Sequence, residues 1–269
     1  MSCNHDCANC DKKHDDGCFL VEPHQNSSIK KIIGIVSGKG GVGKSFVTAT
    51  LASMTQKQGY NCAVLDGDIT GPSMGKMFGI NTKAVGDESC IYPALTSTGI
   101  QVMSTNMLLE EDEMPVIWRG PIIANMVKQF YTDVVYEDVD YMFIDMPPGT
   151  GDVPLTVFQS IPLDGIIIVT SPQELVSMIV TKAYNMAKEM NIPMLGIIEN
   201  FSYVECDQCH HKMYIFGESK VDEIAAKLDI PVLAKLPIRT DITKLSDEGK
   251  IELSNVPELL EVIEKIKKL

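Results

Sequence analysis

One short glycine-rich segment constrains the fold of this chain more than any other feature. The apolar run 32–36 is followed by Gly38-Lys39-Gly40-Gly41-Val42-Gly43-Lys44-Ser45, and a helix-length amphipathic stretch begins directly after it. Glycines let successive backbone N–H groups turn toward an anion, and the positive end of the following helix adds to the attraction. Lys44 can reach β- and γ-phosphates, and the Ser45 hydroxyl can hold Mg²⁺. The segment therefore predicts a phosphate-binding loop between a strand and a helix.

The rest of the chain predicts an α/β fold with a doubly wound, mostly parallel sheet. Short β-branched runs alternate with amphipathic segments such as 45–58 and 177–190, which is typical of parallel strands joined by helices. The runs are continuously apolar, as expected for strands that are covered on both faces. They comprise residues 32–36, 63–65, 100–103, 141–144, 165–170, 194–198 and 232–236.

Acidic residues follow two of these runs. Asp66-Gly67-Asp68 ends the second run, and both carboxylates can face the same side because residues two apart share a face of an extended strand. We assign Asp66 to the Mg²⁺ shell and Asp68 to the attacking water. Asp145 ends the run Tyr-Met-Phe-Ile and is a second candidate for the metal shell. The loop after it carries Gly149, whose N–H could sense a γ-phosphate.

The first 28 residues differ in composition from the rest. They are polar, rich in Asp, Asn, Cys and His, and too poor in apolar side chains to fold without a crosslink or a metal. We therefore predict two parts: a Cys/His-rich appendage over 1–28 and a globular domain over 29–269. The appendage holds four of the eight cysteines, which are Cys3, Cys7, Cys10 and Cys18.

Charge and hydropathy exclude several classes of function. The formal net charge of −13 argues against broad binding to nucleic acid or to an anionic membrane. No apolar run approaches the length of a membrane span, and the N-terminus has no basic segment followed by an apolar one. We expect a cytoplasmic protein, in which clustered thiols are more often metal ligands than disulfides.

A second cysteine motif, Cys206-Asp-Gln-Cys209, lies in a predicted insertion near 203–214. Two thiolates at this spacing supply half of a tetrahedral metal or cluster site. Two completions stay open at this point. His210 or His211 could complete a zinc centre with one further ligand, or a second copy of the chain could contribute its own pair across a twofold axis.

The position of Lys39 is more specific than the loop itself. A lysine directly after the first glycine resembles the deviant Walker A loop of the MinD/ParA/nitrogenase iron-protein group of P-loop NTPases. In that group this lysine crosses a twofold interface to the nucleotide of the partner subunit. The resemblance implies the fold of that group and a homodimer that encloses its nucleotides.

The longer motifs resemble the Mrp/ApbC iron–sulfur cluster carrier ATPases over residues 31 to about 240. The matching stretches are the loop 37–45, Asp-Gly-Asp-Ile-Thr-Gly-Pro-Ser, Trp118-Arg119-Gly120-Pro121, Asp-Met-Pro-Pro-Gly-Thr-Gly-Asp, Ile-Glu-Asn200-Phe-Ser and Cys206-x-x-Cys209 ahead of Phe216-Gly217. The resemblance implies a labile [4Fe–4S] cluster bridging two subunits at the cysteine pair, loading or transfer linked to ATP, and contact of Asn200 with adenine. Where the family often has Asn-Met-Ser, this chain has Asn200-Phe201-Ser202.

The N-terminal cysteines have two interpretations. The eukaryotic cytosolic branch of the family holds a second cluster on four N-terminal cysteines, and Cys3, Cys7, Cys10 and Cys18 resemble these in kind but not in spacing. His5 or His14 could instead help bind zinc. We favour the iron–sulfur interpretation.

These observations predict a slow, switch-type ATP hydrolase that depends on Mg²⁺, forms a homodimer, and delivers a [4Fe–4S] cluster to apo-proteins. The alternative is a MinD/ParA-like positioning or partitioning ATPase without a cluster. It would need a membrane-binding tail or a DNA-binding surface. Segment 256–269 has an apolar stripe, but its glutamates offset its lysines, which favours a closing helix packed on the sheet. A small-molecule kinase or ligase would need an acceptor pocket for which the sequence offers no residue set.

Overall fold

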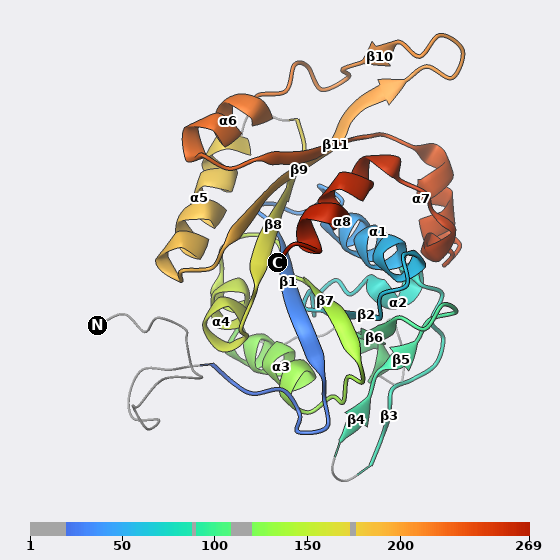
Figure 1. Ribbon diagram of the computed structural model, residues 1–269, viewed down its shortest axis with the longest axis vertical. Coiled ribbons are helices and arrows are strands. Elements are labelled where there is room, and N and C mark those ends of the chain that lie inside the picture. Colours follow the sequence, from blue (N-terminus) through green and yellow to red (C-terminus); the bar gives the residue numbers. More distant parts are fainter. Residues whose placement is uncertain (1–19, 88–89, 109–119, 173–175) are drawn as a thin grey trace.

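Seven parallel strands form the centre of the main sheet in the computed structural model, which describes residues 20–87, 90–108, 120–172 and 176–269 (Figure 1). Their order across the sheet is β11-β9-β8-β1-β7-β2-β6. The strands span β1 Ile29–Ser37, β2 Cys62–Asp66, β6 Gln101–Met103, β7 Val139–Asp145, β8 Gly165–Thr170, β9 Met194–Glu205 and β11 Val232–Pro237. This arrangement confirms the predicted α/β class and mostly parallel sheet.

Alternate residues of each central strand enter two separate hydrophobic cores. In β1, Ile32 belongs to one core and Ile33 to the other, and in β8 the same alternation separates Ile166 from Ile167. All four side chains are buried, and burial of each contributes about 1.5–3 kcal/mol. The continuous apolar runs of the sequence thus reflect a sheet that is covered on both faces.

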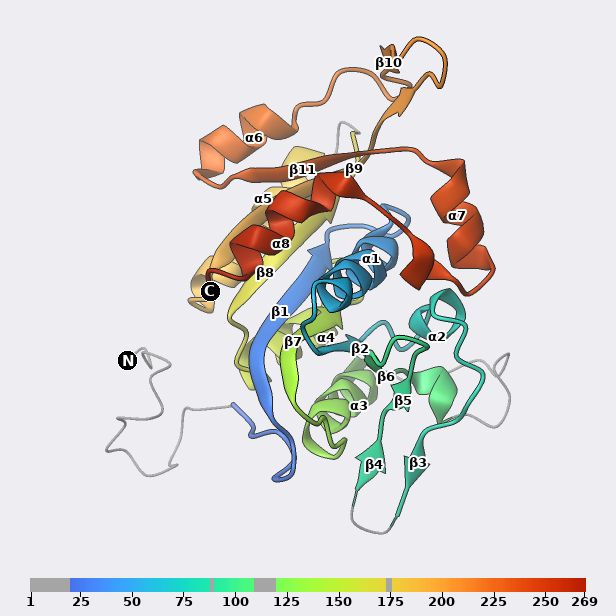
Figure 2. The ribbon, with the colours of Figure 1, turned by 45° about the vertical axis from the view of Figure 1, so that its right-hand side comes forward.

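Helices α3, α4, α5 and α6 cover one face, and α1, α2, α7 and α8 cover the other (Figure 2). The first group spans α3 Gly120–Thr132, α4 Asp152–Ser160, α5 Val176–Glu189 and α6 Val221–Leu228. The second group spans α1 Lys44–Lys57, α2 Met74–Met77, α7 Thr240–Asp247 and α8 Leu260–Ile266. Three short 3₁₀ turns in the described residues are η2 Thr105–Met107, η3 Ile251–Leu253 and η4 Pro257–Leu259.

Antiparallel strands extend the sheet at both edges. At one edge, β5 Ala94–Leu95 pairs with β6. At the other, β9 continues past its parallel partners and pairs with β10 Lys212–Met213, so that a hairpin projects beyond the helical layers (Figures 1 and 2). A separate two-stranded sheet joins β3 Val85–Gly86 to β4 Ile91–Tyr92.

The segment that precedes β1 is attached to the α3–α4 side of the fold. The Val21 N–H donates to Ser160 O, and the Ser28 N–H donates to Tyr136 O, both at 2.8 Å. The four N-terminal cysteines lie outside the described residues, as do Trp118 and Arg119. The division at residue 28 therefore stays a prediction.

The predicted elements agree with the structure in type and place. Every predicted run falls within a strand or, for 100–103, overlaps one, and both predicted helices are present within one residue at each end. Helix α1 differs in its environment, because residues 47–55 are all buried instead of forming one stripe. The C-terminal segment is a closing helix, with Ile263 and Ile266 buried and Leu260 exposed. Within the described residues, no helix is both long enough and apolar enough to span a membrane.

Candidate functional site

The loop 38–43 joins β1 to α1 and has the backbone geometry of an anion-binding loop. Gly41 and Gly43 have φ angles of 80° and 78°, in the left-handed region that side chains disfavour. Gly43 is the N-cap of α1 and has no side chain to cap the helix. The first N–H groups of α1 therefore have no capping side chain and can point toward an anion in the loop. Strand, loop and helix therefore follow in the predicted order.

Asp145 connects the end of β7 to the start of α1. Its carboxylate lies 2.7 Å from Lys44 Nζ, and the side chains are 0% and 6% exposed, respectively. The Ser45 hydroxyl donates to Oδ2 at 2.6 Å, and the Thr48 hydroxyl donates to Oδ1 at 2.8 Å. Removing either ion from such a buried pair leaves the other uncompensated. The structure therefore brings together the lysine, the hydroxyl and the carboxylate that the sequence assigned to phosphate and metal.

Asp66 lies beside Asp145, because β2 and β7 are parallel neighbours with these residues in register. The Asp66 side chain is fully buried and accepts hydrogen bonds from Ser73 N, Met74 N and the Ser104 hydroxyl at 3.1–3.2 Å. Burial, with the Asp145 carboxylate as the next cause, raises the pKa of Asp66 to about 7. The structure thus shows a buried acid that fixes the segment after β2. Its predicted place in a metal shell stays a prediction.

Asp68 is more accessible than Asp66 and is oriented by it. Its backbone N–H donates to Asp66 Oδ1 at 3.2 Å, and its own carboxylate accepts from the Thr70 hydroxyl at 3.3 Å. Burial raises the pKa of Asp68 above its ordinary value, while the charge of Lys44 opposes the shift. A half-buried carboxylate near the loop lysine is compatible with the predicted contact to water.

Two loops meet at the last residue of β1. The Gly149 N–H donates to Ser37 O at 2.7 Å, and the Ser37 hydroxyl donates to Lys39 O at 3.1 Å. Lys39 is half-buried, and Gly149 has a φ of 93°. The loop after Asp145 is therefore hydrogen-bonded to the strand end that leads into the phosphate loop, and the predicted roles of Lys39 and Gly149 stay predictions.

Asn200 of β9 contacts the phosphate loop directly. Its Nδ2 donates to Val42 O at 3.0 Å, and its Oδ1 accepts from Phe201 N at 3.0 Å. A Cβ at Gly43 would lie 2.2 Å from Asn200 Nδ2, so the loop approaches β9 too closely for any side chain there. Asn200 is 1% exposed. The predicted contact with adenine stays a prediction beside this observed contact with the loop.

The cysteine pair lies in the turn between β9 and β10. Cys206 N donates to His211 O at 3.0 Å, and His210 N donates to Cys206 O at 2.9 Å. The backbone N–H groups of Cys209 and Gln208 lower the pKa of Cys206 by hydrogen bonding to its sulfur. Cys209 is exposed and Cys206 partly so. The turn therefore presents two thiols, one with a stabilised thiolate, at the end of a projecting hairpin.

Within the described residues, the two histidines after the pair are not gathered with the cysteines into a ligand set. His210 Nδ1 lies 2.8 Å from Glu205 Oε1. Among the residues that the structure describes, no three His, Cys, Asp or Glu side chains are close enough to hold one ion. Of the two completions that the sequence left open, the structure therefore does not supply the single-chain zinc centre from its described residues.

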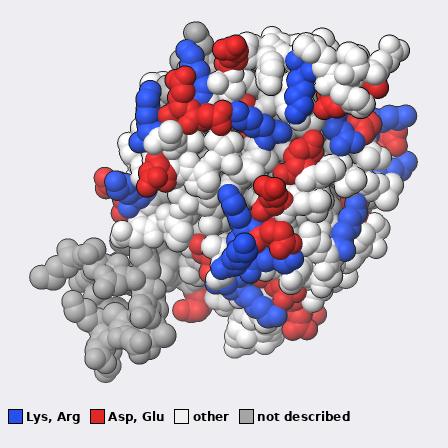
Figure 3. All heavy atoms as spheres, turned by 45° about the horizontal axis from the view of Figure 1, so that its top comes forward, with Lys and Arg blue, Asp and Glu red and all other residues white. Residues whose placement is uncertain are grey.

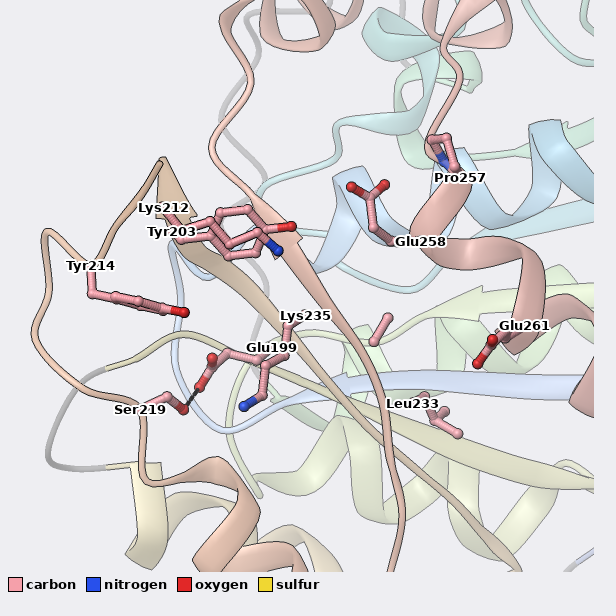
Figure 4. A pocket seen from close by; sticks show the side chains of 11 residues that line it. Glu199, Tyr203, Lys212, Tyr214, Ser219, Leu233, Lys235, Pro257, Glu258 and Glu261 are labelled. Atoms are coloured by element: carbon pink, nitrogen blue, oxygen red, sulfur yellow. Dashed lines mark hydrogen bonds between the residues drawn. The ribbon is translucent and has the colours of Figure 1, made fainter. Parts of the chain in front are cut away.

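A cavity of about 430 Å³ lies beside this hairpin (Figure 4). Tyr203, Lys212 and Tyr214 line it from the hairpin, and Glu258 and Glu261 line it from η4 and α8 on the other side of β11. Residues of the loop 38–43 do not line it. The cavity therefore separates the cysteine hairpin from the C-terminal helix.

Sequence reasoning missed some residues that build the site. Thr48 binds Asp145 from the helix turn after Lys44, and Ser104 binds Asp66 from the residue after β6. Thr48 could have been found, because residues four apart share a helix face. The sequence indicated Ser104 less clearly, because its closeness to Asp66 depends on β6 lying beside β2 in the sheet.

Charges on the face shown in Figure 3 are mixed. Lysine and arginine side chains alternate with aspartate and glutamate, without one broad region of either sign. Elsewhere in the described residues, ion pairs include Lys235 with Asp222 at 2.5 Å and Arg239 with Asp241 at 2.6 Å. This face therefore has no broad field of one sign that would attract a charged partner over a long range.

Comparison with known proteins identifies close relatives. The family model described as ParA: NUBPL iron-transfer P-loop NTPase matches residues 28–268. An iron-sulfur cluster carrier protein from Clostridium perfringens is 44% identical over 262 residues, covering 91% of this chain and 92% of that protein. Another from Methanocaldococcus jannaschii is 46% identical over 225 residues, covering 83% and 78%.

Solved structures of similar proteins share the fold of this chain. A nucleotide-binding protein from Archaeoglobus fulgidus in complex with ADP has a TM-score of 0.78 and 42% identity, and the match covers 87% of this chain and 92% of that one. The septum site-determining protein MinD from Pyrococcus horikoshii, in complex with Mg-ADP, has a TM-score of 0.62 at 20% identity, covering 89% and 96%. The latter likeness shows the fold alone.

Proposed function

Because this chain belongs to the family of NUBPL iron-transfer P-loop NTPases, we propose that it is an ATP-dependent carrier of iron–sulfur clusters. The observation that carries the proposal is the pair Cys206 and Cys209, held at the tip of a hairpin with half of a ligand set. The carrier names of its relatives support the same cargo. In this proposal the chain hydrolyses ATP slowly, as a switch, and hands a [4Fe–4S] cluster to apo-proteins.

The nucleotide part of the proposal uses the loop between β1 and α1. The N–H groups of residues 38–45 surround the phosphates, and Lys44 moves its charge from Asp145 toward them. Asp68, half-buried near the loop, orients the attacking water and accepts its proton. Lys39 reaches the nucleotide of a second copy, and Gly149 senses the γ-phosphate, as the family resemblance implies.

The residues present fit a magnesium ion. The Ser45 hydroxyl and Asp145 Oδ2 lie 2.6 Å apart beside the loop, and hard oxygen ligands of this kind are those that Mg²⁺ prefers. Ser45 and Asp145 would hold the ion, with Asp66 behind them. The ion would neutralise phosphate charge. Asp66 contributes by fixing the segment that carries Asp68.

The cargo part of the proposal requires two copies of the chain. Two thiolates per chain complete a four-thiolate set only when a twofold axis brings two hairpins together. The lowered pKa of Cys206 favours the thiolate that iron binds. The N-terminal cysteines would hold a further cluster. Both sites need reduced thiols, and this is why we expect the protein in the cytoplasm.

Anaerobic reconstitution with iron and sulfide tests the cargo. A chain in which Cys3, Cys7, Cys10 and Cys18 are alanine isolates the hairpin site, and we expect about two iron atoms per chain, from one four-iron cluster per dimer. Adding Cys206→Ala and Cys209→Ala should remove this iron. Cys62→Ala and Cys90→Ala, at buried cysteines elsewhere, are the matched controls and should keep it.

Two results would end the proposal. One is full iron content after loss of both hairpin cysteines. The other is a chain that stays monomeric under anaerobic conditions with Mg-ATP and iron present, as measured by light scattering.

A further inference from the structure

Strand β9 leads from the phosphate loop to the cysteine hairpin. Asn200 touches Val42 of the loop, and Cys206 follows six residues later in the chain. A fully extended strand of that length would cover at most about 20 Å. One element therefore carries both the contact to the nucleotide loop and the thiols.

This strand contains a bulge beside the loop. The pairing with β11 matches Glu199 to Lys235 and then Tyr203 to Pro237, so four steps along β9 oppose two along β11. Phe201, inside the bulge, has a φ of 59°. A residue with a side chain keeps that conformation only where its surroundings hold it, and such positions are common next to functional sites.

Two sets of contacts hold the bulge in place. The ring of Phe201 faces the loop, since its Cζ is 3.3 Å from the position that a Cβ at Gly43 would take. Next to the bulge, Glu199 accepts hydrogen bonds from the hydroxyls of Ser202 and Ser219. A displacement of Gly43 would therefore press on Phe201, while the hydrogen bonds of Glu199 tie the neighbouring Ser202 to Ser219.

The hairpin beyond the bulge has a firm base and free space beside it. The Ile238 N–H donates to the backbone carbonyl of Tyr203 at 2.8 Å, and Lys212 Nζ lies 4.2 Å from the centre of the Tyr203 ring. The 430 Å³ cavity lies between these side chains and Glu258 (Figure 4). A tilt of the hairpin can therefore be accommodated by the cavity without repacking the core.

We propose that the bulge at residues 200–202 couples the state of the phosphate loop to the position of the cysteine hairpin, with Phe201 as the positioning residue. A nucleotide that binds two loop positions with different affinity would then bias the hairpin, and the cluster would bias nucleotide affinity by the same factor. The inference extends the proposed function, because it names the path between ATP and cargo. It requires only that the thiols respond to nucleotide.

The test measures the alkylation rates of Cys206 and Cys209 in the reduced, metal-free full chain, with and without saturating Mg-ATP, by peptide mass spectrometry. Saturation removes any effect of a changed affinity. Phe201→Gly frees the bulge and removes the ring, Phe201→Ala removes the ring alone, and Phe201→Met keeps an apolar side chain of similar reach. Asp229→Gly is the matched control, because Asp229 also has a left-handed backbone, with φ of 54°, but ends α6.

In the parent chain we expect Mg-ATP to change the alkylation rate by about 5-fold or more, within the usual range of coupling. Asp229→Gly and Phe201→Met should keep that ratio, whereas Phe201→Gly and Phe201→Ala should reduce it below about 2-fold. The ratio should be the same at two widely different protein concentrations, because the path lies within one chain.

A Phe201→Gly chain that responds like the parent would overturn the inference, and so would a parent chain whose thiols ignore Mg-ATP. Iron content separates this from the proposed function. Thiols that respond in a chain that takes up no iron would sink the cargo and keep the coupling. Iron bound at the hairpin, together with thiols that do not respond to Mg-ATP, would overturn the coupling and leave the proposed cargo standing.

Discussion

The close approach of Gly43 to Asn200 gives a quantitative prediction for Gly43→Ala. A left-handed alanine costs about 1–2 kcal/mol relative to glycine. The new Cβ would lie 2.2 Å from Asn200 Nδ2, so the amide must leave its hydrogen bond to Val42 O. Leaving these buried groups unpaired costs about 1–3 kcal/mol. We therefore expect a loss of about 2–5 kcal/mol in the free energy of unfolding.

Gly41→Ala is the control for the backbone alone. Gly41 has nearly the same φ, but a Cβ there would meet nothing within 4 Å. This variant should lose only about 1–2 kcal/mol. The difference between the two variants isolates the contact with Asn200.

Urea unfolding of both variants, followed by circular dichroism without nucleotide, measures this difference. In the double variant Gly43→Ala/Asn200→Ala the clash disappears. The loss of unfolding free energy in the double variant should therefore be smaller than the sum of the losses in the two single variants. Equal stability of the Gly41 and Gly43 variants would refute the reasoning, and so would full additivity in the double variant.

Two further predictions concern buried carboxylates. Asp145→Ala should lower the free energy of unfolding by about 3–5 kcal/mol, because it leaves the buried Lys44 unpaired. Adding Lys44→Met removes that unpaired charge, so the double variant should recover most of the loss. Urea unfolding of both variants measures this. Glu252 accepts hydrogen bonds from Thr96, Ser97 and Thr98; burial raises its pKa, but these donors together hold the pKa below its ordinary value of 4.5. A folded-state pKa below the unfolded one stabilises the fold above about pH 4.5, and this is lost as pH falls through the folded value. Glu252→Gln should therefore cost about 1–3 kcal/mol at pH 7. The difference in stability between the variant and the parent should shrink as the pH falls below 4.5, and a difference that is the same at every pH would contradict this.

The central strands could be predicted because their signal is local. Each parallel strand is covered on both faces, so its residues form one continuous apolar run that needs no knowledge of the neighbours. The short strands β3, β4, β5 and β10 were missed, since two residues of strand carry no pattern. The prediction for β9 stopped at Ile198, because Glu199 and Asn200 are polar, yet both are buried there through contacts to distant segments.

The site was predictable as far as topology determines it. Parallel strands bring their carboxyl ends to one edge, which places Asp66 and Asp145 side by side. The left-handed Phe201 could not be found in this way, because it depends on how β9 pairs with β11, a long-range register that leaves no local mark. The burial of α1 on all sides likewise depends on η3 and α8, which come two hundred residues later.

The alternation of the central strands between two cores also bears on which changes in length the chain can accept. Both faces of β7 are apolar, so deleting one residue from it would still leave each core with hydrophobic side chains. The deletion would nevertheless draw Asp145 back by about 3.3 Å and turn it toward the opposite layer, away from Lys44 and Ser45. Strand length in this fold is thus dictated by chemistry at the sheet edge, and natural insertions should be found in the connections.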